Sequence, residues 1–99
     1  MKATGQRIYK KNDAVISRKI AGEMILVPIR GKLADMRRIF TLNPVAEHIW
    51  QRIDGKHTIG DIGDSIISAF EVNRASAERD MEEFIAALLK EDLIAETVP

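Results

Sequence analysis

The residues that could do acid–base or metal chemistry are few, and they do not form a catalytic motif. The two histidines, His48 and His57, lie nine residues apart, and no recognisable motif ties them to a carboxylate pair. Cysteine is absent, which excludes a disulfide framework, an iron–sulfur cluster and a thiolate zinc site. No glycine-rich phosphate loop, Gly-x-Ser-x-Gly or His-Glu-x-x-His run occurs. The sequence therefore predicts a protein that is not an enzyme, with surface histidines and with no cofactor or metal.

Charge is divided unevenly along the chain. Residues 1–57 carry 12 Lys and Arg against 5 Asp and Glu, a balance of +7, and residues 58–99 carry 3 against 10, a balance of −7. The two halves either neutralise each other in the fold, or the basic half faces an acidic partner. The segment from Arg74 to Asp92 has 3 basic and 6 acidic residues, so phosphates would repel it as a recognition helix. A DNA-binding regulator is therefore only the alternative function, because the acidic helix disfavours nucleic acid as a partner.

Peptide binding at a strand edge is the third kind of chemistry that the residues allow. A strand over Arg37 to Leu42 would direct Phe40 and Leu42 inward, and Arg37, Ile39 and Thr41 to the other side. If this strand lies at a sheet edge, its unpaired N–H and C=O groups can bind an extended peptide as an added strand. The candidate contacts are Arg37, Arg38, Ile39, Phe40 and Thr41 on this strand and Arg74, Glu78, Met81 and Ile85 on the last helix. Alternatively, Ile39 is covered by the N-terminal arm or by a second copy, in a structural homodimer.

Three strands are expected to position that edge. Val15 to Ile20 alternates apolar and polar residues, and Ala21-Gly22 is a tight-turn signal. Glu23 to Ile29 is apolar on both faces, which is typical of a central strand. With Arg37 to Leu42 as the third strand, the sequence predicts an antiparallel meander.

Three helices follow, and each begins with a capping signal. Asn43 and Pro44 start a helix that is expected to end near Asp54, because Asn is a favoured N-cap and Pro suits the first helical position. Thr58 starts the second helix, with Asp61 placed to complete a capping box. Asn73 caps the third, which is expected to end near residue 90.

Strands and helices in separate blocks predict the α+β class, with a winged helix-turn-helix-like arrangement. The chain has 99 residues, enough for a single domain, which we place at residues 14–96 after a flexible N-terminal arm at residues 1–13. The longest apolar run, from Met24 to Ile29, is far below the length of a membrane span, and no signal-peptide apolar region is present. We therefore expect a cytoplasmic protein.

Several short motifs, in order and at consistent spacing, resemble the PqqD-like family, which is named after a small factor of pyrroloquinoline quinone (PQQ) biosynthesis. No single motif is specific, but together they extend over roughly Val15 to Glu96. The motifs are Phe40-Thr41-Leu42-Asn43-Pro44, Ile49-Trp50, Ile53 to Ile59, Phe70-Glu71-Val72, Asp80 to Phe84, and Leu88 to Ile94.

The resemblance implies a non-catalytic peptide chaperone. Such domains bind the leader of a ribosomally made, post-translationally modified peptide, typically as a strand added between the third strand and the third helix. They present it to a modifying enzyme, which is a radical S-adenosylmethionine protein in the PQQ pathway. Carried onto this chain, the contact strand is Arg37 to Leu42 and the contact helix Arg74 to Leu89. The resemblance also implies that Leu42, Trp50, Gly55 and Phe84 are scaffold positions and do not contact the peptide.

Overall fold

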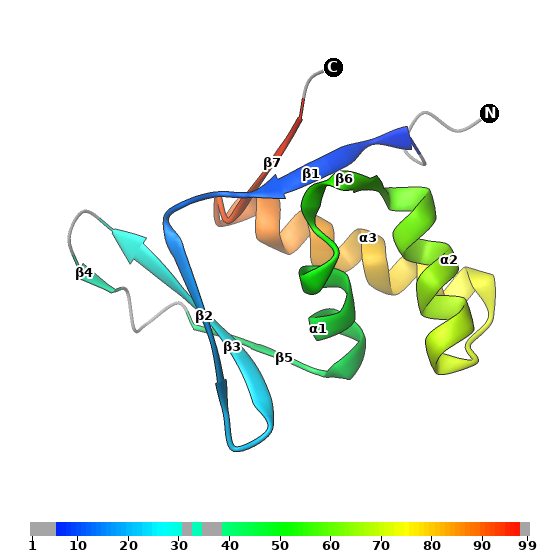
Figure 1. Ribbon diagram of the computed structural model, residues 1–99, viewed down its shortest axis with the longest axis horizontal. Coiled ribbons are helices and arrows are strands. Elements are labelled where there is room, and N and C mark those ends of the chain that lie inside the picture. The colour runs from blue at the N-terminus through cyan, green and yellow to red at the C-terminus, as the bar shows by residue number, and fades with distance from the viewer. Residues whose placement is uncertain (1–5, 31–32, 35–38, 98–99) are drawn as a thin grey trace.

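The secondary structure consists of seven strands and three helices in the described part of the chain (Figure 1). The structure, a computed structural model, describes residues 6–30, 33–34 and 39–97. The predicted α+β class is confirmed, with three antiparallel strands, β2, β3 and β5, followed by the three helices, and the two-residue β4 is a fourth member of the same sheet. The likeness to winged-helix domains is loose, because a second small sheet packs against the helices. The elements are β1 (Ile8–Lys11), β2 (Val15–Ile20), β3 (Glu23–Arg30), β4 (Leu33–Ala34), β5 (Phe40–Leu42), α1 (Pro44–Gln51), β6 (Asp54–Thr58), α2 (Ile59–Phe70), α3 (Arg74–Lys90) and β7 (Ile94–Glu96).

Strand β3 is the centre of the first sheet. It pairs with β2 along one side, from Ile20 opposite Glu23 to Val15 opposite Pro28, and with β5 and the short β4 along the other. A two-residue turn joins β2 to β3, and its residues Ala21 and Gly22 have φ values of 52° and 84°. Positive φ at both central residues is the type I′ geometry, whose twist matches that of the two strands.

The three helices begin where the capping signals predict. The Asn43 side chain accepts a hydrogen bond from the N–H of Ala46 at 2.8 Å, directly before Pro44. Thr58 and Asp61 form both bonds of a capping box, at 3.0 and 3.3 Å. The start of α3 is capped in the same way by the Asn73 side chain.

A second sheet has the order β6-β1-β7, which the sequence did not predict. Tyr9 of β1 pairs with Glu96 of β7 and is 5% exposed, and the Lys11 Nζ lies 5.0 Å from the centre of the Trp50 ring. The expectation of a flexible arm therefore does not describe residues 8–11, because these residues are hydrogen-bonded on both sides and contribute to the core.

The first helix is shorter than predicted because the second sheet includes the residues that follow it. It ends at Gln51 instead of near Asp54, because Asp54–Thr58 forms β6 and pairs with β1. Gly55 lies inside this strand and has a positive φ of 81°.

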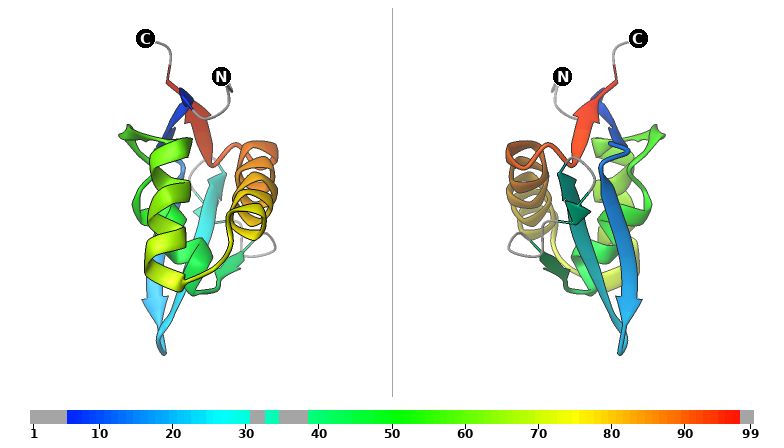
Figure 2. Two further views of the ribbon diagram at one scale, coloured as in Figure 1. Left: turned by 90° about the vertical axis from the view of Figure 1, so that its right-hand side faces the viewer. Right: turned by 90° about the vertical axis from the view of Figure 1, so that its left-hand side faces the viewer.

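The helices cover one face of the β2–β3–β5 sheet, and no described element covers the other face (Figure 2). The core lies between these layers and contains Leu26, Trp50, Ile66 and Leu88, which are at most 2% exposed. At Gly63 of α2, a Cβ would lie 3.4 Å from the Met81 methyl carbon, an ordinary van der Waals distance between α2 and α3. The packing of the helices on the sheet brings α3 opposite β5, and the candidate site lies between these two elements.

Candidate functional site

A groove of about 400 Å³ separates the β5–α1 segment from α3. Its lining residues are Phe40, Thr41, Leu42, Asn43, Val45, Ala46 and Ile49 on one side and Asp80, Glu83, Phe84 and Ala87 on the other. The residues that pack into the core at its base are apolar, whereas Asp80 and Glu83 are exposed on the helix side. The groove therefore combines an apolar floor, an acidic helix wall and a strand.

The strand wall of this groove has unpaired backbone groups on its outer edge. The residues of a strand direct their N–H and C=O groups alternately to the two sides. The N–H of Ile29 donates to the carbonyl of Ala14 on the β2 side, so Ile25 also directs its groups towards β2. Thr41 is opposite Ile25, and the groups that β5 shares with β3 are consequently those of Phe40 and Leu42. The N–H and C=O of Thr41 point away from β3, to the open edge.

The strand residues proposed from the sequence separate into two faces. Phe40 and Thr41 line the groove, with Phe40 packed against the core and Thr41 exposed. Ile39 is 37% exposed and is not among the lining residues. Like Thr41, it alternates with the core-packed Phe40 and Leu42, so its side chain is directed to the face of the strand opposite the core. Arg37 and Arg38 lie outside the described residues.

The helix residues proposed from the sequence do not line the groove. Met81 and Ile85 are 3% and 7% exposed and belong to the core cluster, so their side chains are covered by protein. Arg74 forms an ion pair with Asp64 of α2, at 3.1 Å. Glu78 is half-buried and is not a lining residue.

The groove face of α3 instead contains Asp80, Glu83, Phe84 and Ala87, none of which was proposed as a contact. At 100° per residue, Asp80, Glu83 and Ala87 lie more than a quarter of a turn from both Met81 and Ile85, and Phe84 lies about 60° from Met81, at the edge of the core stripe. Phe84 was expected to be only a scaffold residue, but it is partly buried and lines the groove. The signal that could have identified this face is the i, i+4, i+7 spacing of residues 80, 84 and 87 beside the core stripe.

A second hollow of about 300 Å³ lies on the other side of α3. It is lined mainly by apolar side chains, including Tyr9 and Ile59, with Arg7 and Glu82 at its margin. Met81 and Ile85 contribute to its lining, so the two hollows lie on different faces of the same helix.

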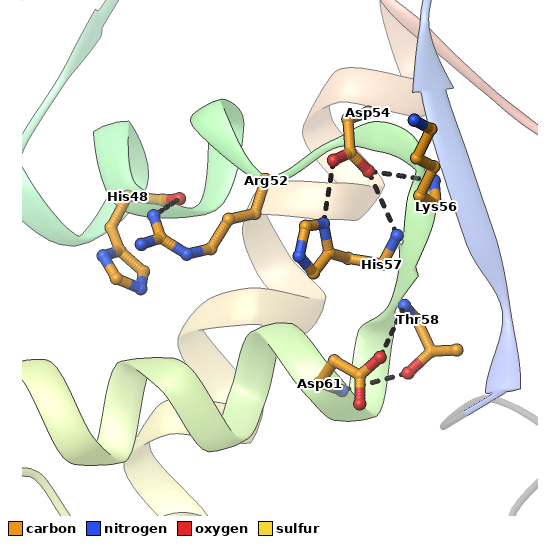
Figure 3. Close-up of polar contacts among 7 residues, drawn as sticks. All are labelled: His48, Arg52, Asp54, Lys56, His57, Thr58 and Asp61. Atoms are coloured by element: carbon orange, nitrogen blue, oxygen red, sulfur yellow. Dashed lines mark hydrogen bonds and ion pairs between the residues drawn. The ribbon is translucent and has the colours of Figure 1, made fainter.

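Neither histidine lines the groove. The carboxylate of Asp54 accepts the backbone N–H groups of Lys56 and His57 and lies 2.8 Å from the His57 ring nitrogen Nδ1 (Figure 3). These hydrogen bonds, led by the backbone N–H of His57, lower the pKa of Asp54 from 3.8 to about 2. The cluster lies at the start of β6, and none of its residues lines the groove.

His48 connects two helices. Its Nε2 lies 2.8 Å from the Ser65 hydroxyl of α2, and its ring packs edge-on against Phe70 at 5.3 Å between ring centres. Burial, followed by the nearby Arg52 charge, lowers the pKa of His48 below its ordinary value. The imidazole is therefore a packed contact between α1 and α2, more enclosed than a surface histidine.

The described residues contain no group of three or more His, Cys, Asp or Glu side chains that could hold a metal ion. None of the described helices is long and apolar enough to cross a membrane.

Comparison of the sequence with models of known families identifies the family of this chain. The family model of Coenzyme PQQ synthesis protein D (PqqD) matches residues 23–94. The chain belongs to the PqqD family. The matched segment of this PqqD-family protein begins with β3 and ends at the first residue of β7, so it contains both walls of the groove.

A solved structure resembles this PqqD-family protein over most of its length. It is described as TbiB1 in complex with the TbiA(beta) leader peptide, and the match has a TM-score of 0.72 and 28% sequence identity. The match covers 91% of this chain and 99% of that chain. Comparison with the curated proteins found no match.

Proposed function

We propose that this protein binds the leader segment of a ribosomally made precursor peptide and presents it to a modifying enzyme. The leader adds as a strand to the open edge of β5, and its side chains enter the groove in front of α3. The backbone of residues 39–41 supplies hydrogen bonds, and the groove supplies selectivity.

The observation that carries the proposal is the open edge of β5 beside the groove. Thr41 is exposed and directs its N–H and C=O away from β3 at the mouth of a groove of about 400 Å³. The similarity to a protein solved with a leader peptide supports the same conclusion. An extended segment fits an edge of this kind because each of its residues can satisfy backbone groups that water otherwise solvates.

The protein acts in this proposal without catalysis of its own, as a cytoplasmic partner of a radical S-adenosylmethionine-type enzyme. The absence of a cofactor-binding motif in the sequence and membership of the PqqD family support that role. The modified product is PQQ or a product of a related peptide pathway.

Of the proposed contacts, Phe40 and Thr41 remain in the site, and Asp80, Glu83, Phe84 and Ala87 replace the earlier helix residues. We retain Arg37 and Arg38 as proposed contacts because they precede the open edge in sequence, and Ile39 because an added strand would extend its face of the sheet.

Two alternatives make distinct predictions. A homodimer formed through β5 would use the same edge, so peptide binding would then lower the molecular mass measured by sedimentation. A DNA-binding regulator would present α3 to phosphates, yet the exposed α3 residues beside β5 are Asp80 and Glu83, which would repel them.

Replacing Thr41 tests strand addition. Random 12-residue peptides, displayed and selected on the full-length wild-type chain, serve as probes. We expect Thr41→Pro to lower the affinity for the selected peptides at least roughly tenfold, because proline removes the N–H on the open edge and leaves the β3 pairing in place. Thr41→Val is the matched control, since it keeps the N–H and the β-branched shape and should bind within about threefold of the wild type.

Amide chemical shifts locate the bound peptide. We expect the shifts of the wild-type chain to change at residues 39–43 and 80–87. The proposal would be overturned if Thr41→Pro bound the peptides as tightly as Thr41→Val does. It would also be overturned by shift changes gathered around Tyr9 and Ile59, or by a selection that yields no binding peptide.

A further inference from the structure

The wall of the groove formed by α3 is acidic, whereas the described lining residues of the β5–α1 side are uncharged. Asp80 and Glu83 are both exposed and line the groove, and no described cation forms an ion pair with either of them. The other groove residues of α3, Phe84 and Ala87, are half-buried and apolar. A ligand between the walls therefore meets an apolar surface and two carboxylates on the same helix.

The length of this wall fixes how many ligand side chains it can contact. From Asp80 to Ala87 the helix rises about 10 Å. An added strand turns every second side chain towards the groove, and successive groove-facing side chains are about 7 Å apart. The wall therefore contacts two of them, at positions i and i+2 of the bound segment.

We infer that the groove selects a leader with an apolar side chain at one of these positions and a Lys or Arg at the other. This inference rests on the proposed peptide binding and adds the class of leader. The apolar side chain packs between Phe40 and Phe84, and the cation lies between the carboxylates of Asp80 and Glu83. The basic first half of the chain contributes its strand edge here, and the charge that recognises the ligand comes from the acidic second half.

Two neighbouring glutamates of α3 make a matched test. Glu83 lines the groove and Glu82 lines the other hollow, and both are exposed. The probe is a peptide selected on the wild-type chain from the random 12-residue library, together with its synthetic counterpart in which the groove-facing Lys or Arg is replaced by Gln. Affinities are measured by fluorescence anisotropy at low and high salt.

We expect the Gln peptide to bind the wild-type chain roughly threefold more weakly than the basic peptide, with a smaller difference at high salt. Glu83→Lys should weaken the basic peptide roughly tenfold and leave the Gln peptide nearly unchanged, because it converts an attraction into a repulsion. Glu82→Lys makes the same change in net charge one residue away, and it should affect neither peptide by more than about twofold. Selection repeated on Asp80→Lys should enrich Asp or Glu at the position where the wild type enriches Lys or Arg.

Three results would overturn the inference. They are equal affinities for the basic and the Gln peptides, equal effects of Glu82→Lys and Glu83→Lys, and enrichment of acidic residues by the wild-type chain. The last result would assign the selecting charge to Arg37 and Arg38. In each of these cases a strong effect of Thr41→Pro would leave the proposed peptide binding intact, so the failures of the two proposals are distinguishable.

Discussion

At the scale of single residues, the roles that can be predicted from the sequence are those that depend on local hydrogen bonds. Asn43, Thr58 and Asn73 act on backbone groups three residues away, so their roles as caps follow from the sequence alone. The contacts on α3 were harder to predict. Met81 and Ile85 are apolar and regularly spaced, but they pack in the core. The groove is lined instead by Asp80 and Glu83, which no apolar pattern identifies. Apolar spacing shows that a face is buried without showing what covers it.

The Asp54 carboxylate makes the stability of the fold depend on acid pH. Its pKa is lowered from 3.8 to about 2, so the folded chain favours the ionised form more than the unfolded chain does. This contribution is complete above about pH 4 and is lost as the pH falls towards 2. We expect urea unfolding midpoints of the wild type to decrease between pH 4 and pH 2.

Asp54→Asn should show a smaller decrease over the same interval, since Asn can still accept the N–H of His57 but does not titrate. A carboxyl ¹³C titration of Asp54 with a midpoint near its ordinary value would contradict the assignment.

At the scale of elements, the type I′ turn between β2 and β3 carries a residue that does not suit it. Ala21 is exposed with φ 52°, a conformation that costs an L-residue with a Cβ about 1 kcal/mol and that Asn tolerates better. We expect Ala21→Asn to raise the free energy of unfolding by about 0.5 kcal/mol and the melting temperature by a few degrees. Thermal unfolding followed by circular dichroism measures this change.

The opposite substitution at the same turn provides the control. Ala21→Val should lower the melting temperature, because a β-branched side chain is disfavoured at positive φ. Equal melting temperatures for the Asn and Val variants would show that the turn does not limit stability.

Among the elements, the sheet of β2, β3 and β5 could be predicted and the sheet of β6, β1 and β7 could not. The hairpin of β2 and β3 is local, with a turn signal between two apolar strands. In contrast, β1 has four residues and β7 has three, and they pair across most of the chain, with Tyr9 opposite Glu96. Neither strand has enough residues for an alternating pattern to be distinguished from a loop.

At the scale of the whole molecule, β1 lies between β6 and the C-terminal β7 and contributes Tyr9 to the core. Tyr9 is 5% exposed and packs in the core cluster, whereas its neighbour Lys10 is exposed. We expect Tyr9→Ala to lower the free energy of unfolding by about 3 kcal/mol, through the loss of a buried aromatic side chain. Lys10→Ala should change it by less than about 0.5 kcal/mol. Urea denaturation of the two variants distinguishes a structural β1 from a dispensable arm, for which both effects would be small.

The position of β1 between β6 and β7 also has a consequence for synthesis on the ribosome. Strand β1, the first of the described strands in chain order, has one of its two partners among the last described residues, Ile94–Glu96. The β2–β3 hairpin and the three helices can form as they emerge, but β1 must wait for its second neighbour. During that interval the Tyr9 side chain lacks its final cover, so nascent chains halted before β7 should be the ones most exposed to proteases and chaperones.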